Sequence, residues 1–221
     1  MSDLRELIVQ WQRGWGTARA VPAADDLGPG LRVRCLQLGR AVEYFALDTA
    51  PAALRDLAGR VAGEAEVTWL TVPTTDPSAT AAVLDAAGLV VLKGSELLMT
   101  AELSTHPQHL PAPGYRLETT ADAAVLTTTV VHESGEVGAR GTMGLTGPDA
   151  TADRIETLPS HRRRGLGSAL MGALAAGAVD AGASRGILVA SEEGQHLYTK
   201  LGWHPVASVL IAATPGTVYP D

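Results

Sequence analysis

The stretch RIETLPSHRRRGLGSALM, residues 154–171, constrains the fold more than any other part of the chain. Its first residues favour a strand, Pro159 interrupts that strand, and leucines recurring every four residues from Leu166 predict a helix. Between them, Gly165 and Gly167 lack a Cβ and permit backbone conformations that other residues avoid. The sequence therefore predicts a strand, a glycine-rich turn and a helix in direct succession.

A turn of this kind suits an anion. The first N–H groups of a helix have no acceptor within the helix, and the helix dipole adds partial positive charge there. Glycines let a phosphate oxygen approach these amides closely, and the Ser168 hydroxyl and the arginines at 162–164 add further attraction. We interpret the turn as a pyrophosphate site. The alternative is a charged turn that is merely solvated.

Spacing excludes two common phosphate loops. A Walker A loop requires Gly-Lys followed by Ser or Thr, whereas lysine occurs only at Lys93 and Lys200. A dinucleotide fingerprint requires a third glycine three residues after the second, but Gly167 is followed next by Gly172. The pattern that remains is Arg-x-x-Gly-x-Gly after a strand.

This pattern resembles the pyrophosphate-binding motif of the GNAT superfamily of acyl-CoA N-acyltransferases. A second stretch, ASEEGQHLYTKLGWHP at residues 190–205, resembles the closing segment of the same family, in which a helix with Leu-Tyr leads through Leu-Gly-Trp or Leu-Gly-Phe to a strand. The resemblance covers about residues 113–221. It implies an α/β fold with a GNAT-like mixed, mostly antiparallel central sheet flanked by helices.

The resemblance also implies acetyl-CoA as co-substrate and no metal. Backbone groups of Ile155, Thr157 and Leu158 would pair with the pantetheine arm, and the amides of residues 163–168 would receive the pyrophosphate. Ser191 stands where many members carry an asparagine that contacts the cofactor, so that contact is in doubt here. The expected cofactor-binding residues are Ile155, Thr157, Leu158, Arg162, Arg163, Arg164, Gly165, Leu166, Gly167, Ser168 and Ser191.

Two catalytic candidates follow. Tyr198 stands where the family often places the general acid that protonates the departing CoA thiolate, and Glu156 is the second candidate. As alternatives, Tyr198 is a half-buried aromatic residue and Glu156 an outward-facing strand residue. A thiol pKa of about 8.5 makes the thiolate a tolerable leaving group, so the acid is helpful rather than indispensable. The general base is unassigned among Glu133, Glu136, Glu156 and His132.

A proline-rich segment at residues 104–116 separates two patterned regions, and we expect domains at 1–110 and 111–221. Each region ends in a strand, a helix, a glycine and a long strand. This echo suggests a tandem arrangement with a degenerate GNAT-like first half and one CoA site, unless it is a coincidence of common elements. Where typical members place helices between the first two strands, residues 115–132 leave room only for a turn. Either the first half walls the acceptor pocket or the pocket is open.

The amino-acid composition limits the kinds of binding partner that the protein can have. The 221 residues carry a formal net charge of −7, which argues against a nucleic-acid partner. Cys35 is the single cysteine, so an internal disulfide and a multi-cysteine zinc site are excluded. No segment reaches the roughly 18 apolar residues of a membrane helix, and the N-terminus does not resemble a signal peptide. We expect a cytoplasmic protein without a membrane partner, and its arginine and alanine bias suggests a bacterial genome.

Two functions remain open. The first is an N-acetyltransferase that transfers an acetyl group directly from acetyl-CoA to an amine of a small molecule or peptide. The second is a non-catalytic acyl-CoA-binding module that senses or scaffolds. The acceptor is not identified by the sequence, and a homodimer is left open.

Overall fold

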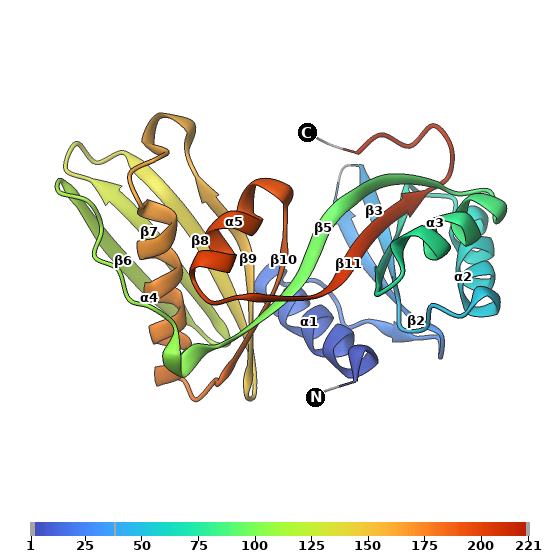
Figure 1. Ribbon diagram of the computed structural model, residues 1–221, viewed down its shortest axis with the longest axis horizontal. Helices are drawn as coiled ribbons and strands as arrows, with labels where there is room; N and C mark the ends of the chain where they lie inside the picture. Colours follow the sequence, from blue (N-terminus) through green and yellow to red (C-terminus); the bar gives the residue numbers. More distant parts are fainter. Residues whose placement is uncertain (1–2, 38, 220–221) are drawn as a thin grey trace. The chain divides into compact units, whose positions relative to one another are not determined.

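The computed structural model describes residues 3–37 and 39–219 (Figure 1). Its contacts divide the chain into two compact units. Unit 1 comprises Met1–Gln12, Val21–Leu98 and Pro205–Asp221, and unit 2 comprises Arg13–Ala20 and Met99–His204. No helix in the described part of the chain is both long enough and apolar enough to cross a membrane.

Unit 1 is a sheet with the hydrogen-bonded order β1-β2-β3-β4-β11-β5. β3 and β4 are parallel, while β1 and β2, β2 and β3, and β4 and β11 are antiparallel. Leucines of α2 and β4 form its core with Leu84 and Leu210. Its elements are β1 (Asp25–Asp26), β2 (Gly30–Gln37), β3 (Arg40–Ala46), α2 (Pro51–Gly63), β4 (Thr68–Thr74), α3 (Pro77–Ala86), most of β5 (Val90–Glu102) and nearly all of β11 (His204–Ala213). The helix α1 (Leu4–Arg19) begins in unit 1 and ends in unit 2.

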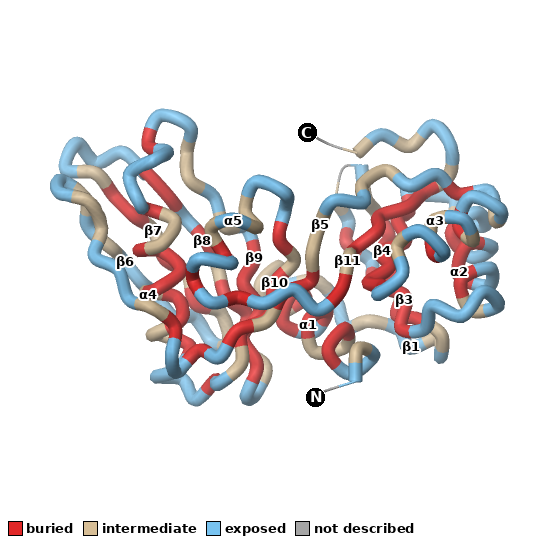
Figure 2. The backbone as a smooth tube through the Cα atoms, in the orientation of Figure 1, coloured by how far each residue is buried: buried red, intermediate tan, exposed pale blue. Residues whose placement is uncertain are grey.

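Unit 2 has the strand order β5-β10-β9-β8-β7-β6, to which β5 contributes its last residues. β6 to β9 form an antiparallel meander, and β10 runs parallel to β9. The helix α4 packs against the meander and is buried along much of its length (Figure 2). The elements are η1 (Leu103–Thr105), β6 (Tyr115–Asp122), β7 (Val125–His132), β8 (Val137–Thr146), β9 (Asp149–Thr157), η2 (Pro159–His161), α4 (Leu166–Asp180), β10 (Arg185–Ala190) and α5 (Glu192–Lys200).

These elements confirm the expected mixed α/β fold. Residues Val90–Glu102 form one long continuous strand, β5. β6 and β7 are joined by a tight turn without intervening helices, as the short spacing implied. Gly135 makes the next hairpin turn with a φ of 90°. The sequence of residues 31–38 predicts a strand, and its last residue, Leu38, lies outside the described residues.

The two compact units are not consecutive halves of the sequence. β11 comes after α5 in the sequence, yet it pairs with β4 from Ser208 opposite Thr74 to Ala213 opposite Trp69. Conversely, β5 ends within unit 2. Each unit therefore contains a strand segment from the other half of the sequence. Hydrophobic patterning identifies a strand but not the sheet it joins, and the division at 110 stays a prediction about domains.

Candidate functional site

β9 separates from β10 halfway along its length. The parallel ladder pairs Asp149–Thr151 with Arg185–Ile187 and stops there. On the other edge of β9, pairing with β8 continues to Thr157, but Arg154 and Ile155 together face one residue of β8, which is a β-bulge. A bulge bends its strand, so the second half of β9 leaves β10 and exposes one backbone edge.

Backbone hydrogen bonds show which residues use that edge. Glu156 is paired with β8, and the Leu158 N–H donates to the Gly138 carbonyl at 2.9 Å. Because antiparallel pairing alternates, Thr157 directs its backbone groups toward the opposite, unpaired edge. Ile155 lies at the bulge, where the alternation is interrupted. The expectation for Leu158 has to be corrected, since its N–H is engaged with β8 and is not available to a ligand.

The turn after β9 presents a run of unengaged amides. Arg163 and Gly165 both have left-handed backbone, with φ values of 64° and 73°. The N–H groups of residues 163–167 have no acceptor in the described part of the chain, whereas the Ser168 N–H donates to the Gly165 carbonyl at 3.1 Å. Alternating left- and right-handed residues point successive N–H groups into one concavity, which favours an anion. Ser168 is left with its hydroxyl as the group it can offer.

The three consecutive arginines differ in what they contact. Arg162 Nε donates to the Thr157 carbonyl at 3.2 Å and thereby holds the end of β9 against the turn. Arg164 Nη1 donates to the Tyr115 hydroxyl at 2.9 Å. The Arg163 side chain has no hydrogen-bond or ion-pair partner among the described residues. Arg162 and Arg164 thus shape the turn, and Arg163 is the arginine whose charge is uncommitted.

The side chains of Tyr115 and His161 form a hydrogen-bonded aromatic pair next to the turn. The Tyr115 hydroxyl hydrogen-bonds to Nδ1 of the buried His161 at 2.7 Å. Gly138 of β8 makes room for this arrangement, since a Cβ there would lie 2.9 Å from both the Tyr115 ring and Leu166. Leu166 is itself buried, so it can offer a ligand only its backbone.

The helix α5 packs against the start of α4, next to this turn. Gly167 permits a close approach of α4, because a Cβ there would lie 3.0 Å from Leu197 Cδ2. Ser191 is the N-cap of α5, and its hydroxyl accepts from the Gly194 N–H at 3.4 Å. That hydroxyl therefore already serves the helix.

Tyr198 of α5 is buried, with 7% of its surface exposed. Its ring lies edge-on to the fully buried Trp203, with ring centroids 6.1 Å apart. The Tyr198 hydroxyl has no hydrogen-bond partner among the described residues. Burial, reinforced by the charge of Asp153, raises the pKa of Tyr198 to about 12. The hydroxyl is therefore protonated at neutral pH and able to donate.

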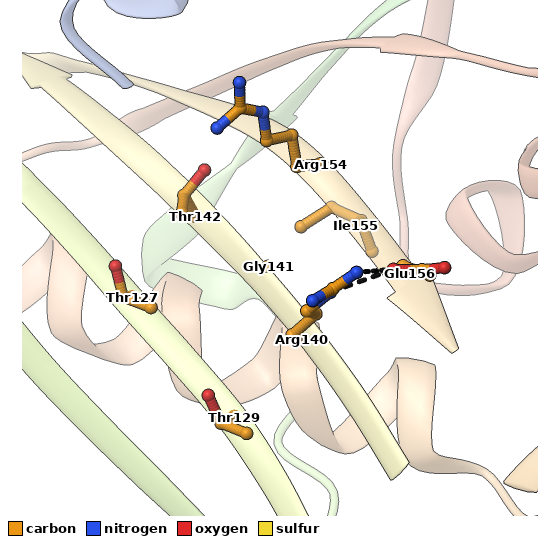
Figure 3. Close-up of a pocket in the computed structure, with 8 residues that line it drawn as sticks. All are labelled: Thr127, Thr129, Arg140, Gly141, Thr142, Arg154, Ile155 and Glu156. Carbon is orange, nitrogen blue, oxygen red and sulfur yellow. Dashed lines mark hydrogen bonds and ion pairs between the residues drawn. The ribbon is translucent and has the colours of Figure 1, made fainter. Parts of the chain in front are cut away.

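A pocket of about 640 Å³ lies on β7, β8 and β9 (Figure 3). Its size falls in the range of small-molecule sites, roughly 300–1,000 Å³. Glu156 is in its wall, where the Glu156 carboxylate accepts from Arg140 Nε at 2.9 Å and forms an ion pair with Arg140 Nη2 at 2.8 Å. The lining residues are Thr127, Thr129, Arg140, Gly141, Thr142, Arg154, Ile155 and Glu156.

The other candidate bases lie elsewhere. His132 Nδ1 is 2.9 Å from the Ser134 hydroxyl, which donates to Glu136 at 3.0 Å in the turn between β7 and β8. Neither His132 nor Glu136 lines the pocket, and Glu133 does not line it either. Of the residues considered as bases, the structure brings only Glu156 to the pocket.

The model of a family described as an acetyltransferase (GNAT) domain matches residues 125–205, which include the bulged strand, the turn and α5. This match lies within the C-terminal half of the chain. No curated protein is similar enough in sequence to count as a match.

Solved structures share the fold over nearly the whole chain. A GCN5-related N-acetyltransferase from Kribbella flavida is 19% identical with a TM-score of 0.69, covering 98% of this chain and 97% of its own. A putative GNAT-family acetyltransferase from Novosphingobium aromaticivorans is 18% identical with a TM-score of 0.61, with coverages of 94% and 96%. A tandem GNAT protein from the clavulanic acid biosynthesis pathway is 16% identical with a TM-score of 0.59, with 94% of each chain covered. At these identities the likeness shows the fold, which the chain shares over nearly its whole length.

Most of the residues that line the pocket were not predicted from the sequence. Thr127 and Thr129 alternate with buried Leu126 and Val130, so period-two patterning of β7 could have placed them on one face. Arg154 gave no such signal, because the bulge that positions it depends on pairing with β8.

Proposed function

We propose that the GNAT domain is an N-acetyltransferase that transfers the acetyl group of acetyl-CoA directly to an amine of a small molecule or peptide. GNAT membership supports acyl transfer in general. The use of acetyl-CoA is supported mainly by the run of unengaged amides at residues 163–167. These amides lie at the start of α4, directly after the part of β9 that is not paired with β10.

The two features suit the two ends of one co-substrate. A pyrophosphate gains several charge-assisted hydrogen bonds from the amides of the turn and long-range attraction from Arg163. The pantetheine arm carries amide groups, and one of their carbonyls can accept from the Thr157 N–H on the exposed edge of β9, since the Thr157 carbonyl is already bound to Arg162. Together they would place the thioester beside β9, near the bulge.

The proposed reaction needs placement, an oxyanion donor and proton transfer. The amine nitrogen attacks the thioester carbon, a C–N bond forms and the C–S bond breaks. A backbone N–H on the exposed edge of β9 would stabilise the oxyanion, and the proton lost by the amine passes to Glu156 or to water. The Tyr198 hydroxyl, which is protonated at neutral pH, gives its proton to the departing thiolate, and its raised pKa makes it a weaker acid than an exposed tyrosine.

The test is incubation of the whole chain with acetyl-CoA and a panel of amines, with free thiol measured by a colorimetric reagent and the N-acetylated product by mass spectrometry. We expect thiol and product to appear in equal amounts with at least one amine. Thiol release without product would indicate hydrolysis. Binding of acetyl-CoA without either would leave the non-catalytic binding module as the function.

A further inference from the structure

Arg154 adopts a backbone conformation that arginine normally avoids. Its φ is 53°, within the bulge of β9, where the left-handed region costs a residue with a Cβ about 1–2 kcal/mol. Such strain persists where the surrounding structure imposes it, and it is concentrated at functional sites. Here the strained residue directs a guanidinium into the wall of the pocket, and 58% of that side chain is exposed (Figure 3).

Among the described residues, the one ion pair of the Arg154 guanidinium is a long one, to Asp153. Asp153 is the nearest carboxylate, with Oδ2 3.9 Å from Arg154 Nε. Both oxygens of Asp153 already accept from Arg19, at 2.8 Å each. The other arginine of the pocket, Arg140, is bound to Glu156. The charges of Arg19 and Asp153 neutralise each other, as do those of Arg140 and Glu156. One positive charge, that of Arg154, is therefore left at the pocket.

Neutral donors lie in the same wall. The hydroxyls of Thr127 and Thr129 have no hydrogen-bond partner among the described residues, whereas that of Thr142 donates to the Asp153 carbonyl at 3.1 Å. Figure 3 shows Arg154 at one end of the pocket, the Arg140–Glu156 pair at the other, and the side chains of Thr127 and Thr129 on β7. A small anionic group suits this combination of one uncompensated guanidinium and free hydroxyls, since guanidinium binds carboxylate and phosphate through paired hydrogen bonds.

We propose that Arg154 binds an anionic group of the acceptor, so that the substrate is a small molecule carrying both an amine and a carboxylate or phosphate. This inference rests on the proposed acetyl transfer. Arg154 and Glu156 flank Ile155 on β9, the strand beside which the thioester would lie. A ligand anchored at Arg154 would therefore hold its amine close to the acyl group, and the whole-chain charge of −7 makes a local cation important for attracting it.

The experiment compares matched amines that differ in one anionic group. Phenylalanine is paired with phenethylamine and O-phosphoethanolamine with ethanolamine, and kcat/KM is measured at saturating acetyl-CoA. We expect the anionic member of at least one pair to be preferred about tenfold or more, the factor of one charge-assisted hydrogen bond. The pair that shows the preference tells carboxylate from phosphate.

Substitutions assign the preference to Arg154. Arg154→Asn removes the charge and tolerates left-handed backbone, so the protein should fold and melt at the same or a higher temperature. In this variant the preference should fall to about twofold or less, and Arg154→Lys should restore part of it. Arg55→Gln, an exposed arginine on α2 in unit 1, makes the same charge change and should leave the preference intact.

Failure of this inference is separable from failure of the proposed function. Equal use of both members of each pair, or a preference that survives Arg154→Asn, overturns the role of Arg154 while transfer stands. If no amine is acetylated, calorimetry with N-acetylphenylalanine and N-acetylphenethylamine, and with their phosphoethanolamine and ethanolamine counterparts, gives the same comparison without turnover. Preferential binding of an anionic product, lost in Arg154→Asn, supports the inference, and equal binding or no binding contradicts it.

Discussion

Arg164 Nη1 donates to the Tyr115 hydroxyl over 2.9 Å, so one of the three consecutive arginines is directed at the protein and not at a ligand. Arg162 is likewise bound to the Thr157 carbonyl. The basic run therefore acts largely as a brace for the turn. The groups left for a phosphate are the backbone amides and Arg163.

Tyr115→Phe tests this bracing. The change removes the acceptor of Arg164 and the hydroxyl bound to His161, which loosens the turn without altering an amide. We expect acetyl-CoA to bind about two- to tenfold more weakly by calorimetry, the effect of about one hydrogen bond. Tyr44→Phe, which removes a hydroxyl bound to Glu64 in unit 1, is the matched control. Wild-type affinity in Tyr115→Phe would mean that the turn holds its shape unaided.

Tyr198→Phe tests the proposed acid. Binding of acetyl-CoA should be unchanged, and kcat should fall about tenfold, below the usual 10²–10⁴ for general catalysis because a thiolate leaves readily. Since burial raises the pKa of Tyr198 to about 12, its proton is lost only in strongly alkaline solution. The pH profile of kcat should therefore show no decline attributable to Tyr198 below about pH 10. A fully active Phe variant would reduce Tyr198 to a packing residue.

His106 makes unit 2 sensitive to mild acid. Trp203 Nε1 donates to His106 Nε2 at 3.2 Å, and His106 Nδ1 lies 3.1 Å from the Pro107 carbonyl. Both ring nitrogens of the neutral imidazole are therefore engaged in hydrogen bonds. Burial lowers the pKa of His106. The unfolded chain then binds the proton more readily, and stability is complete above about pH 6.5 and declines as the pH falls below it. Melting temperatures between pH 7 and 5 should fall less in His106→Gln than in the wild type. Equal declines in the two proteins would count against this assignment.

Glu64 stabilises unit 1 through a charged network. Its Oε1 accepts from Arg32 Nε at 2.7 Å and from the Tyr44 hydroxyl at 2.8 Å, and the Arg32 hydrogen bond is the main reason that the pKa of Glu64 is lowered. A lowered pKa gives stability that is present above about pH 4.3 and lost as the pH falls further. Glu64→Gln should cost about 1.5–3 kcal/mol at pH 7 in urea unfolding. The two proteins should converge in acid, and a constant difference down to acid pH would show that charge is not involved.

The turn could be predicted from the local sequence, whereas the contacts around the turn could not. The spacing of Gly165 and Gly167 after a strand predicted the left-handed turn and the start of α4, because those features depend on adjacent residues. The engagement of the Leu158 N–H with β8 and the inward direction of Arg164 depend on residues 20 and 49 positions away in the sequence. No local pattern encodes such partners.

The same distinction explains the pocket and the sheets. Arg154 gave no signal in the sequence, and it acquires its position from a bulge that exists only once β8 and β9 are in register. β11 was recognised as a strand, but its pairing with β4 depends on long-range contacts. The family resemblance identified the two sequence motifs. It did not indicate which backbone and side-chain donors are already engaged within the protein.

The most direct measurement is calorimetric titration of acetyl-CoA into three proteins, the wild type, Gly165→Asp and Gly182→Asp. Both glycines have left-handed backbone, with φ values of 73° and 92°, and a Cβ at either position would meet open space, so the substitutions bring similar strain and the same charge. Only Gly165 belongs to the turn. We predict that the wild type and Gly182→Asp bind with equal affinity and that Gly165→Asp shows no binding at millimolar ligand. Absence of binding to the wild type, or equal binding by both variants, would contradict the account.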